Sequence, residues 1–227
     1  MRLTLTTFVT MDGVMQSPGA PEEDPRNGFD LGGWLPPHFG EALGQYMNEV
    51  FDAADAFLLG RFSYQAMAGF WPQVNDPANR VAVQFNSCPK YVVTETLADL
   101  SWAGSVPLRG DIPKQVAELK QTPGRELQIH GSGALVRSLM PHGLIDAYRL
   151  VIFPVVLGRG QRLFADGTPP ATMRLVDTRG TGSGVVMHTY GLRAAGARIK
   201  AHPVTLRCAA DATTVRPSPA RGRVMPR

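Results

Sequence analysis

One stretch, residues 127–136, restricts the possible folds of this 227-residue chain more than any other. It reads Leu-Gln-Ile-His-Gly-Ser-Gly-Ala-Leu-Val, so an apolar run ends at a Gly-Ser-Gly turn and an amphipathic segment with Leu139 and Met140 follows. This order predicts a strand, a tight turn and a helix whose first backbone N–H groups face outward. Such a terminus carries about half an elementary positive charge and suits a phosphate, and glycine lets a ligand approach the backbone closely. Alone, the pattern is ambiguous, because many strand–helix turns contain two glycines for steric reasons.

The composition is that of a globular protein, with 44% hydrophobic residues. No apolar run approaches the roughly 18 residues of a membrane span. The chain opens with Met-Arg and an alternating pattern, which is unlike a signal peptide. The two cysteines, Cys88 and Cys208, lie far apart, and no close Cys/His spacing suggests zinc. We therefore expect a cytoplasmic protein with no membrane segment and no metal.

The net charge of +4 is concentrated in the tail. Residues 195–227 hold seven basic side chains against one acid, a net of +6, and the other 194 residues hold 16 basic and 18 acidic, a net of −2. The Ala/Arg/Pro-rich composition of the tail predicts a disordered extension after a folded domain at 1–194. The acidic balance of that domain argues against nucleic acid as a partner, except through the tail.

The folded part alternates strand and helix patterns. Strands are predicted at 3–9, 56–60, 91–94, 127–129, 147–156, 172–178 and 185–192, and helices at 41–54, 61–70, 77–87, 112–120 and from 135. The last two strands flank a turn rich in glycine at 180–184. This order predicts an α/β fold with a mostly parallel mixed sheet that closes on an antiparallel hairpin.

A Gly/Pro-rich loop at 16–37 interrupts this order and contains Phe29 and Trp34, which is unusual for a solvated connector. Loops of this length are often functional. Trp34 either walls a substrate pocket or staples the loop to the surface, and the sequence leaves both alternatives open.

Several polar turns follow predicted strands: Asp12-Gly13, Gly60-Arg61-Phe62-Ser63, Thr94-Glu95 and the turn at 131–133. In an open α/β sheet, ligands bind outside the carboxyl ends of the strands. The arginine, the hydroxyls and the backbone donors together indicate a site for a phosphorylated nucleotide. A Rossmann domain is disfavoured, because its glycine loop follows the first strand, whereas here it comes late.

Four segments in this order resemble the dihydrofolate-reductase-like superfamily. They are residues 8–13 (Phe-Val-Thr-Met-Asp-Gly), 58–64 (Leu-Leu-Gly-Arg-Phe-Ser-Tyr), 129–135, and 154–164 (Pro-Val-Val-Leu-Gly-Arg-Gly-Gln-Arg-Leu-Phe). Within it, the chain is similar to stand-alone relatives of the reductase domain of the bacterial riboflavin-biosynthesis deaminase-reductase. The resemblance covers about residues 2–193 and leaves the tail without a counterpart.

The resemblance implies a three-layer fold with helices on both faces of the sheet, NADPH as cofactor, a small-molecule substrate and a homodimer. It places Arg61 and Ser63 at the ribose 2′-phosphate, with Thr94 beside them, and Asp12 near the nicotinamide. The remaining cofactor positions that it implies are Gly13, Gly60, Gly131, Ser132, Gly133, Ala134, Leu135, Val155, Gly158 and Gly160. The reaction expected from it is hydride transfer to a C=N or C=O bond of a small heterocycle or ribosylated pyrimidine.

Each of these residues also has an explanation that involves no function. Arg61 is otherwise a surface arginine, Asp12 part of a plain turn, and His130 a packed histidine. Asp12 and Asp30 are the candidate proton donors, although neither has the sequence context of the carboxylate that dihydrofolate reductases use. The H-x-E and P-C-x-x-C patterns of the zinc deaminase are absent from the sequence. A non-catalytic NADP(H)-binding dimer is the alternative to a reductase.

Overall fold

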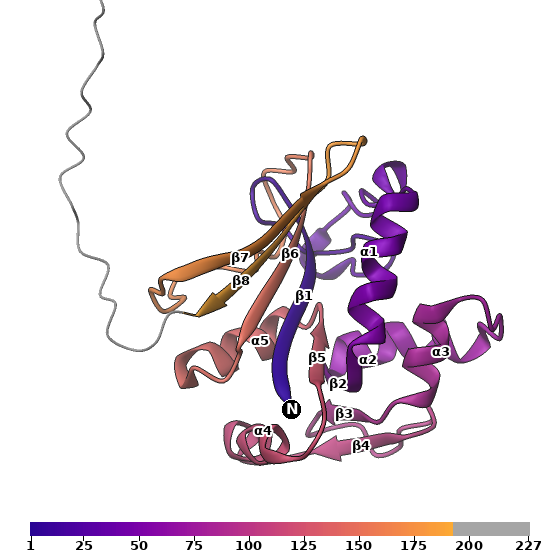
Figure 1. Ribbon diagram of the computed structural model, residues 1–227, viewed down its shortest axis with the longest axis vertical. Helices are drawn as coiled ribbons and strands as arrows, with labels where there is room; N and C mark the ends of the chain where they lie inside the picture. The colour runs from indigo at the N-terminus through magenta and orange to yellow at the C-terminus, as the bar shows by residue number, and fades with distance from the viewer. Residues whose placement is uncertain (193–227) are drawn as a thin grey trace, which may run out of the picture.

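The computed structural model describes residues 1–192, and the predicted basic tail lies outside the described residues. Eight strands form one sheet, in the order β4-β3-β2-β5-β1-β6-β8-β7 (Figure 1). Their bounds are β1 Arg2–Thr10, β2 Ala54–Gly60, β3 Lys90–Val93, β4 Ser105–Leu108, β5 Glu126–His130, β6 Ala147–Phe153, β7 Met173–Gly180 and β8 Val186–Leu192. The first six strands in chain order run parallel, and β8 pairs antiparallel with both β6 and β7.

Helices cover both faces of the sheet. The α-helices are α1 Glu41–Asp52, α2 Arg61–Ala68, α3 Arg80–Ser87, α4 Ile112–Gln121 and α5 Gly133–Leu139. Short 3₁₀ turns lie at Arg26–Gly28, Pro36–His38, Trp71–Gln73 and Met140–His142. The predicted fold class, with its parallel sheet, its closing hairpin and its two helical layers, is confirmed.

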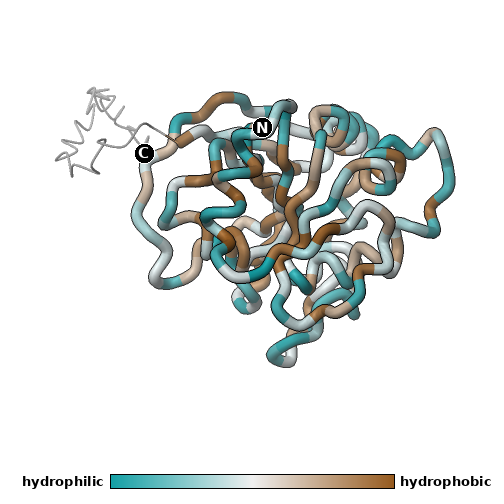
Figure 2. Tube along the Cα trace, turned by 90° about the horizontal axis from the view of Figure 1, so that it is seen from below, coloured by the Kyte–Doolittle hydropathy of each residue, from teal (hydrophilic) through white to brown (hydrophobic). Residues whose placement is uncertain are grey.

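Alternation along the central strand divides the interior into two cores. Leu3, Leu5 and Val9 of β1 face the core under α4 and α5, while Phe8 packs toward the core under α1, α2 and α3. Successive strand side chains point to opposite faces, so one strand supplies both cores. Many of the hydrophobic segments accordingly run through the middle of the fold (Figure 2).

Four expectations about element bounds need correction. The helix predicted at 41–54 ends at Asp52, and Ala54 already belongs to β2. The helix predicted at 77–87 begins at Arg80, because the Asn79 side chain accepts a 3.0 Å hydrogen bond from the Ala82 N–H and caps it there. The strand predicted to reach residue 156 ends at Phe153, because Pro154 has no N–H to donate to a neighbouring strand. The helix predicted at 61–70 ends at Ala68.

Strand β4 has no counterpart among the strands predicted from the sequence. This strand has only four residues, lies at the edge of the sheet and contains Pro107. Proline is tolerated at an edge because the missing N–H faces away from the partner strand. The segment therefore lacks the length and alternation by which a strand is recognised in sequence.

Candidate functional site

The site lies at the edge of the sheet where the parallel strands end. The turns after β1, β2, β3 and β5 all reach this edge, because neighbouring strands pair in parallel, as in Thr6 with His130 and Gly60 with Val93. The loop after β6 joins them, since β6 is parallel to β1 over its whole length. The predicted polar turns are thus neighbours in space, at the position where open α/β sheets bind ligands.

The glycine-rich turn after β5 is joined directly to the start of α2. The Ser132 hydroxyl accepts a hydrogen bond from the Gly60 N–H (3.0 Å) and donates one to the Ser63 hydroxyl (2.8 Å). Ser63 Oγ also accepts from the Ser132 N–H at 3.1 Å. Its own proton finds no acceptor among residues 1–192, so the Ser63 hydroxyl is available to donate to a ligand.

The backbone of this turn is unusual. Gly131 and Ser132 both have positive φ angles, 65° and 51°. Ser132 is the N-cap residue of α5, but its side chain makes no capping hydrogen bond to the helix. The first-turn N–H groups of α5 therefore lack the usual side-chain acceptor, and Gly133 and Ala134 belong to this turn.

Arg61 begins α2 beside the loop that follows β3. Its Nη1 donates a 2.9 Å hydrogen bond to the Thr96 hydroxyl, and its guanidinium lies 4.6 Å from the centre of the Phe62 ring. No carboxylate in the described chain lies within 4.0 Å of it. Its charge is therefore free to meet an anion.

Thr94 supports this loop. Its hydroxyl accepts hydrogen bonds from the N–H groups of Thr96 (3.2 Å) and Leu97 (3.0 Å), and the residue is buried. Such a turn fixes the loop backbone and leaves Thr96 facing Arg61. Thr96 was missed in the sequence, because only the contact to Arg61, 35 positions away, identifies it.

Asp12 ties the turn after β1 to the loop after β6. Its carboxylate accepts hydrogen bonds from the Thr10 hydroxyl (2.6 Å) and from the N–H groups of Leu157 (3.3 Å) and Gly158 (2.9 Å). The hydrogen bond from Thr10 is the main reason that the pKa of Asp12 falls to about 2. A carboxylate that stays ionised at neutral pH is poorly suited to donate a proton, so the geometry favours the turn alternative for Asp12.

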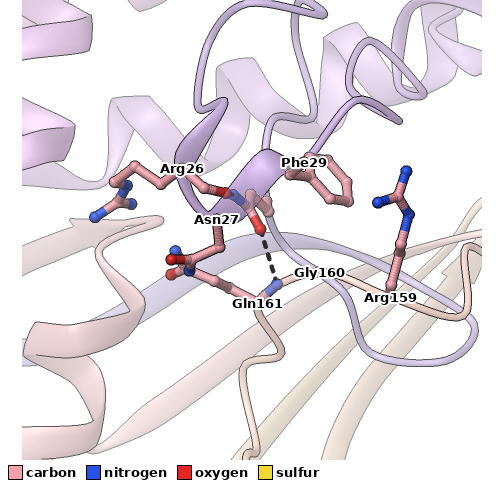
Figure 3. Close-up of a pocket in the computed structure, with 7 residues that line it drawn as sticks. Arg26, Asn27, Phe29, Arg159, Gly160 and Gln161 are labelled. Atoms are coloured by element: carbon pink, nitrogen blue, oxygen red, sulfur yellow. Dashed lines mark hydrogen bonds between the residues drawn. The ribbon is translucent and has the colours of Figure 1, made fainter.

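Asp30, the other candidate acid, is more than two-thirds exposed and forms an ion pair with Arg159. Arg159, its partner, lines a small surface pocket between the long loop and the loop after β6 (Figure 3). In this pocket, the Gln16 side-chain oxygen accepts a 3.0 Å hydrogen bond from the Gln161 N–H. The pocket lining comprises Gln16, Arg26, Asn27, Phe29, Arg159, Gly160 and Gln161.

Trp34 anchors the long loop. Its indole N–H donates a 2.9 Å hydrogen bond to the Gln16 carbonyl, and its ring packs edge-on against Phe153 at 5.3 Å. The side chain is buried in the core under α1. These contacts favour the stapling alternative.

The segments at 11–15 and 155–162 run side by side. The Met11 N–H donates to the Val155 carbonyl (2.8 Å), and Val14 forms a bridge with Arg162. Gly160 is required at its position, because a Cβ there would lie 2.6 Å from Val14 Cγ1 and its φ is +119°. The segments that carry Gly13, Val155, Gly158 and Gly160 thus lie together beside Asp12.

His130 fits the packed-histidine alternative. It is buried, stacks on Phe51 at 4.4 Å between ring centroids and shares a 2.9 Å hydrogen bond with the Gln128 side chain. Burial lowers its pKa to about 3, so the ring is neutral at physiological pH. The Gln128 side chain in turn donates a hydrogen bond to Glu126, which forms a largely buried ion pair with Arg149 at 2.6 Å.

The described residues contain neither a cluster of metal ligands nor a helix that could span a membrane. Between residues 1 and 192, no group of three or more His, Cys, Asp and Glu side chains gathers closely enough to hold a metal ion. A bilayer-crossing helix is also absent from this range, since none combines the needed length with the needed hydrophobicity.

Comparisons with known proteins agree with this architecture. The family model of the RibD C-terminal domain matches residues 2–187. An uncharacterised Bacillus subtilis protein, YyaP, is 28% identical over 195 residues, which cover 83% of this chain and 94% of YyaP.

Two solved structures share the fold. A putative riboflavin biosynthesis protein from Shewanella superposes with a TM-score of 0.60 at 18% identity, covering 85% of this chain and 99% of that one. Dihydrofolate reductase from Enterococcus faecalis, complexed with NADP(H), gives 0.54 at 12% identity, covering 85% and 96%.

The sheet order and the turns at its carboxyl edge therefore define a protein of the dihydrofolate-reductase-like fold class. Within that class, the chain belongs to the family of the RibD C-terminal domain. The family and the fold relate it to reductases, as its sequence motifs suggested.

Proposed function

We propose that this protein is an NADPH-dependent reductase that transfers a hydride to a C=N or C=O bond of a small heterocyclic or ribosylated pyrimidine-like substrate. The observation that carries the proposal is that two sets of hydrogen-bond donors, each suited to a phosphate, lie at the same edge of the sheet. Arg61 with Thr96 forms one group, and Ser63 with the turn at 131–133 forms the other.

These residues suit a dinucleotide with an extra phosphate. Arg61 has a guanidinium without a carboxylate partner in the described chain, and the Thr96 hydroxyl lies 2.9 Å from it, which matches the needs of a ribose 2′-phosphate. The Ser63 hydroxyl proton and the uncapped amides at the start of α5 suit the diphosphate. The dihydrofolate reductase from E. faecalis, which shares the fold, is complexed with NADP(H) in its solved structure.

When bound, the nicotinamide would supply the hydride, and the chain itself would bind, orient and exclude water. Asp12 would act by holding the loops at 11–15 and 155–162 together rather than by donating a proton. Trp34 and Gln16 would hold the long loop against the rest of the site. The proton that accompanies the hydride would then come from water.

Binding can be tested by thermal unfolding with NADPH, NADP⁺ and NADH. A ligand that binds only the folded chain raises its stability by RT ln(1 + [L]/Kd), about 2.7 kcal/mol at a hundredfold excess over Kd. We expect NADPH to stabilise the wild type more than NADH does. Arg61→Gln should remove most of that difference, because a charged hydrogen bond contributes about 1.5–3 kcal/mol.

The matched control is Arg2→Gln, which makes the same change at the exposed start of β1, at the opposite end of the parallel strands. It should bind NADPH as the wild type does. No stabilisation of the wild type by NADPH would refute the proposed function. Equal stabilisation by NADH and NADPH would refute only the role of Arg61.

A second candidate function is an NADP(H)-binding dimer without turnover. It is favoured by the states of the two candidate acids, since Asp12 is held as a carboxylate and Asp30 is paired on the surface. Both candidates bind NADPH, so oxidation of NADPH at 340 nm with a panel of heterocyclic carbonyl and imine substrates separates them. If no substrate causes NADPH oxidation although NADPH binds, the dimer without turnover is favoured.

We also propose a homodimer. Leu175 and Val176 of the edge strand β7 are about half exposed, and exposed apolar side chains on an open strand favour pairing. Light scattering coupled to size exclusion should give twice the mass of the 24.6 kDa chain.

A further inference from the structure

Arg137 lies over the start of the helix that carries it. It follows Gly133 by one turn of α5, and helical side chains point back toward the N-terminus, so its guanidinium reaches the glycine turn. Its Nη1 lies 3.2 Å from the position that a Cβ on Gly133 would occupy. The guanidinium therefore lies directly beside the glycine turn, next to the Met15 side chain.

The charge of Arg137 is not neutralised. Its hydrogen bond within the described chain goes from Nη1 to the Arg162 carbonyl at 3.2 Å, and no carboxylate between residues 1 and 192 lies within 4.0 Å of it. Three arginines of the adjoining loops differ, since Arg26 pairs with Asp24, Arg159 with Asp30 and Arg162 with Asp12. A guanidinium has five N–H donors, so most of those of Arg137 remain available for an anion.

The Met15 side chain borders the same turn. Its sulfur lies 2.7 Å from the Cβ position on Gly133, so the thioether covers the turn. Methionine is unbranched and adaptable, and its far end can move aside for a ligand at small cost. The turn at 131–133 is thus covered by a movable apolar side chain and flanked by an unpaired cation.

We infer that Arg137 binds the diphosphate of the dinucleotide, which divides the cofactor between two arginines. This inference rests on the proposed function. Arg61 on α2 meets the 2′-phosphate, while Arg137 on α5 meets the diphosphate over Gly133. A planar guanidinium binds phosphate oxygens through two parallel hydrogen bonds.

A purely structural role is the competing explanation. The hydrogen bond to the Arg162 carbonyl joins α5 to the loop after β6, and Arg162 in turn donates a 2.9 Å hydrogen bond to the Asp12 carbonyl. If Arg137 only linked these segments, its loss would lower stability and weaken every ligand alike. If it binds the diphosphate, its loss weakens only ligands that contain one.

Isothermal titration calorimetry separates the two roles with three ligands: NADPH, 2′-phospho-ADP-ribose and adenosine 2′-monophosphate. The first two carry the diphosphate and the third does not. Arg137→Gln removes the charge, Arg137→Lys retains it, and Arg2→Gln is the control at the start of β1. Thermal unfolding without ligand reports on the structural role of the hydrogen bond to residue 162.

We expect Arg137→Gln to weaken NADPH and 2′-phospho-ADP-ribose by about tenfold or more, the usual effect of losing a charged hydrogen bond. Binding of adenosine 2′-monophosphate should stay within about twofold of wild type. Arg137→Lys should lose less affinity for the diphosphate ligands, and Arg2→Gln should lose none. If the Gln variant is too unstable to titrate, Arg137→Lys provides the same test. Lysine lacks the planar fork of the guanidinium, so this variant should still lose affinity for the diphosphate ligands and keep its affinity for adenosine 2′-monophosphate.

Two results would overturn the inference: unchanged affinity of Arg137→Gln for the diphosphate ligands, or an equal loss for all three ligands. Wild-type protein that binds none of the ligands would instead overturn the proposed function on which the inference rests.

Discussion

Replacing Asp12 by Asn should measure how much the Asp12 carboxylate contributes to the stability of the site. The carboxylate receives three hydrogen bonds that join the turn after β1 to the loop after β6. They lower its pKa from 3.8 to about 2. A difference of one pKa unit corresponds to about 1.4 kcal/mol, so the full shift amounts to roughly 2.5 kcal/mol.

Solvent screening reduces this figure, because the Asp12 side chain retains some exposure, 19%. We therefore expect Asp12→Asn to lower the free energy of unfolding at pH 7 by about 1–2 kcal/mol. The sign follows from linkage: a carboxyl with a depressed pKa stabilises the fold above its unfolded value of about 3.8 and loses that contribution as the pH falls toward 2. The difference between mutant and wild type should therefore shrink between about pH 4 and pH 2.

The assay is urea unfolding of both proteins at a series of pH values, with the Asp12 carboxyl followed separately by carbon NMR. Asp30→Asn is the matched control, because its ion pair with Arg159 is exposed and worth less than about 1 kcal/mol. An Asp12 carboxyl that titrates near 3.8, or a mutant as stable as the wild type at pH 7, would refute the reasoning.

Two further predictions concern the surroundings of the site. Gly160→Ala should destabilise the fold by about 2 kcal/mol or more, measured by thermal unfolding, because the new Cβ would meet Val14 at 2.6 Å and the φ of +119° is strained for any other residue; a melting temperature equal to that of wild type would contradict this. Buried His130 has a pKa near 3 in the fold, well below its unfolded value, so the unfolded chain gains a proton as the pH falls from about 6.5 to 3 and stability declines over that range. His130→Gln should flatten the decline in pH-dependent urea unfolding, and an unchanged slope would show that the ring is protonated in the folded protein.

Much of the fold was predictable because it depends on local patterns. The strand–turn–helix at 127–139 follows from apolar periodicity and glycine, and the parallel sheet follows from the alternation of strands with helices. The exceptions have local causes as well. The edge strand β4 was missed because its four residues include a proline, and α3 begins late because Asn79 supplies a cap.

Individual roles were harder to predict than the location of the site. Asp12 was equally compatible with a turn and with an acid, and its partners Leu157 and Gly158 lie about 146 positions away. Trp34 was compatible with a pocket wall or a staple until its hydrogen bond to Gln16 and its contact with Phe153 were seen. Thr96 and Arg137 carried no signal in the sequence, because each acquires its place only through a folded neighbour.

The sequence by itself determined the fold class, the position of the glycine turn and the edge of the sheet where polar turns gather, because backbone geometry makes these depend on short-range order. Only the tertiary structure decided which side chains are already satisfied and which remain free. Asp12 is saturated with hydrogen bonds, whereas Arg61, Ser63 and Arg137 retain donors with no acceptor among residues 1–192. Hydrogen-bond satisfaction depends on groups that are distant in the chain, so local pattern cannot reveal it.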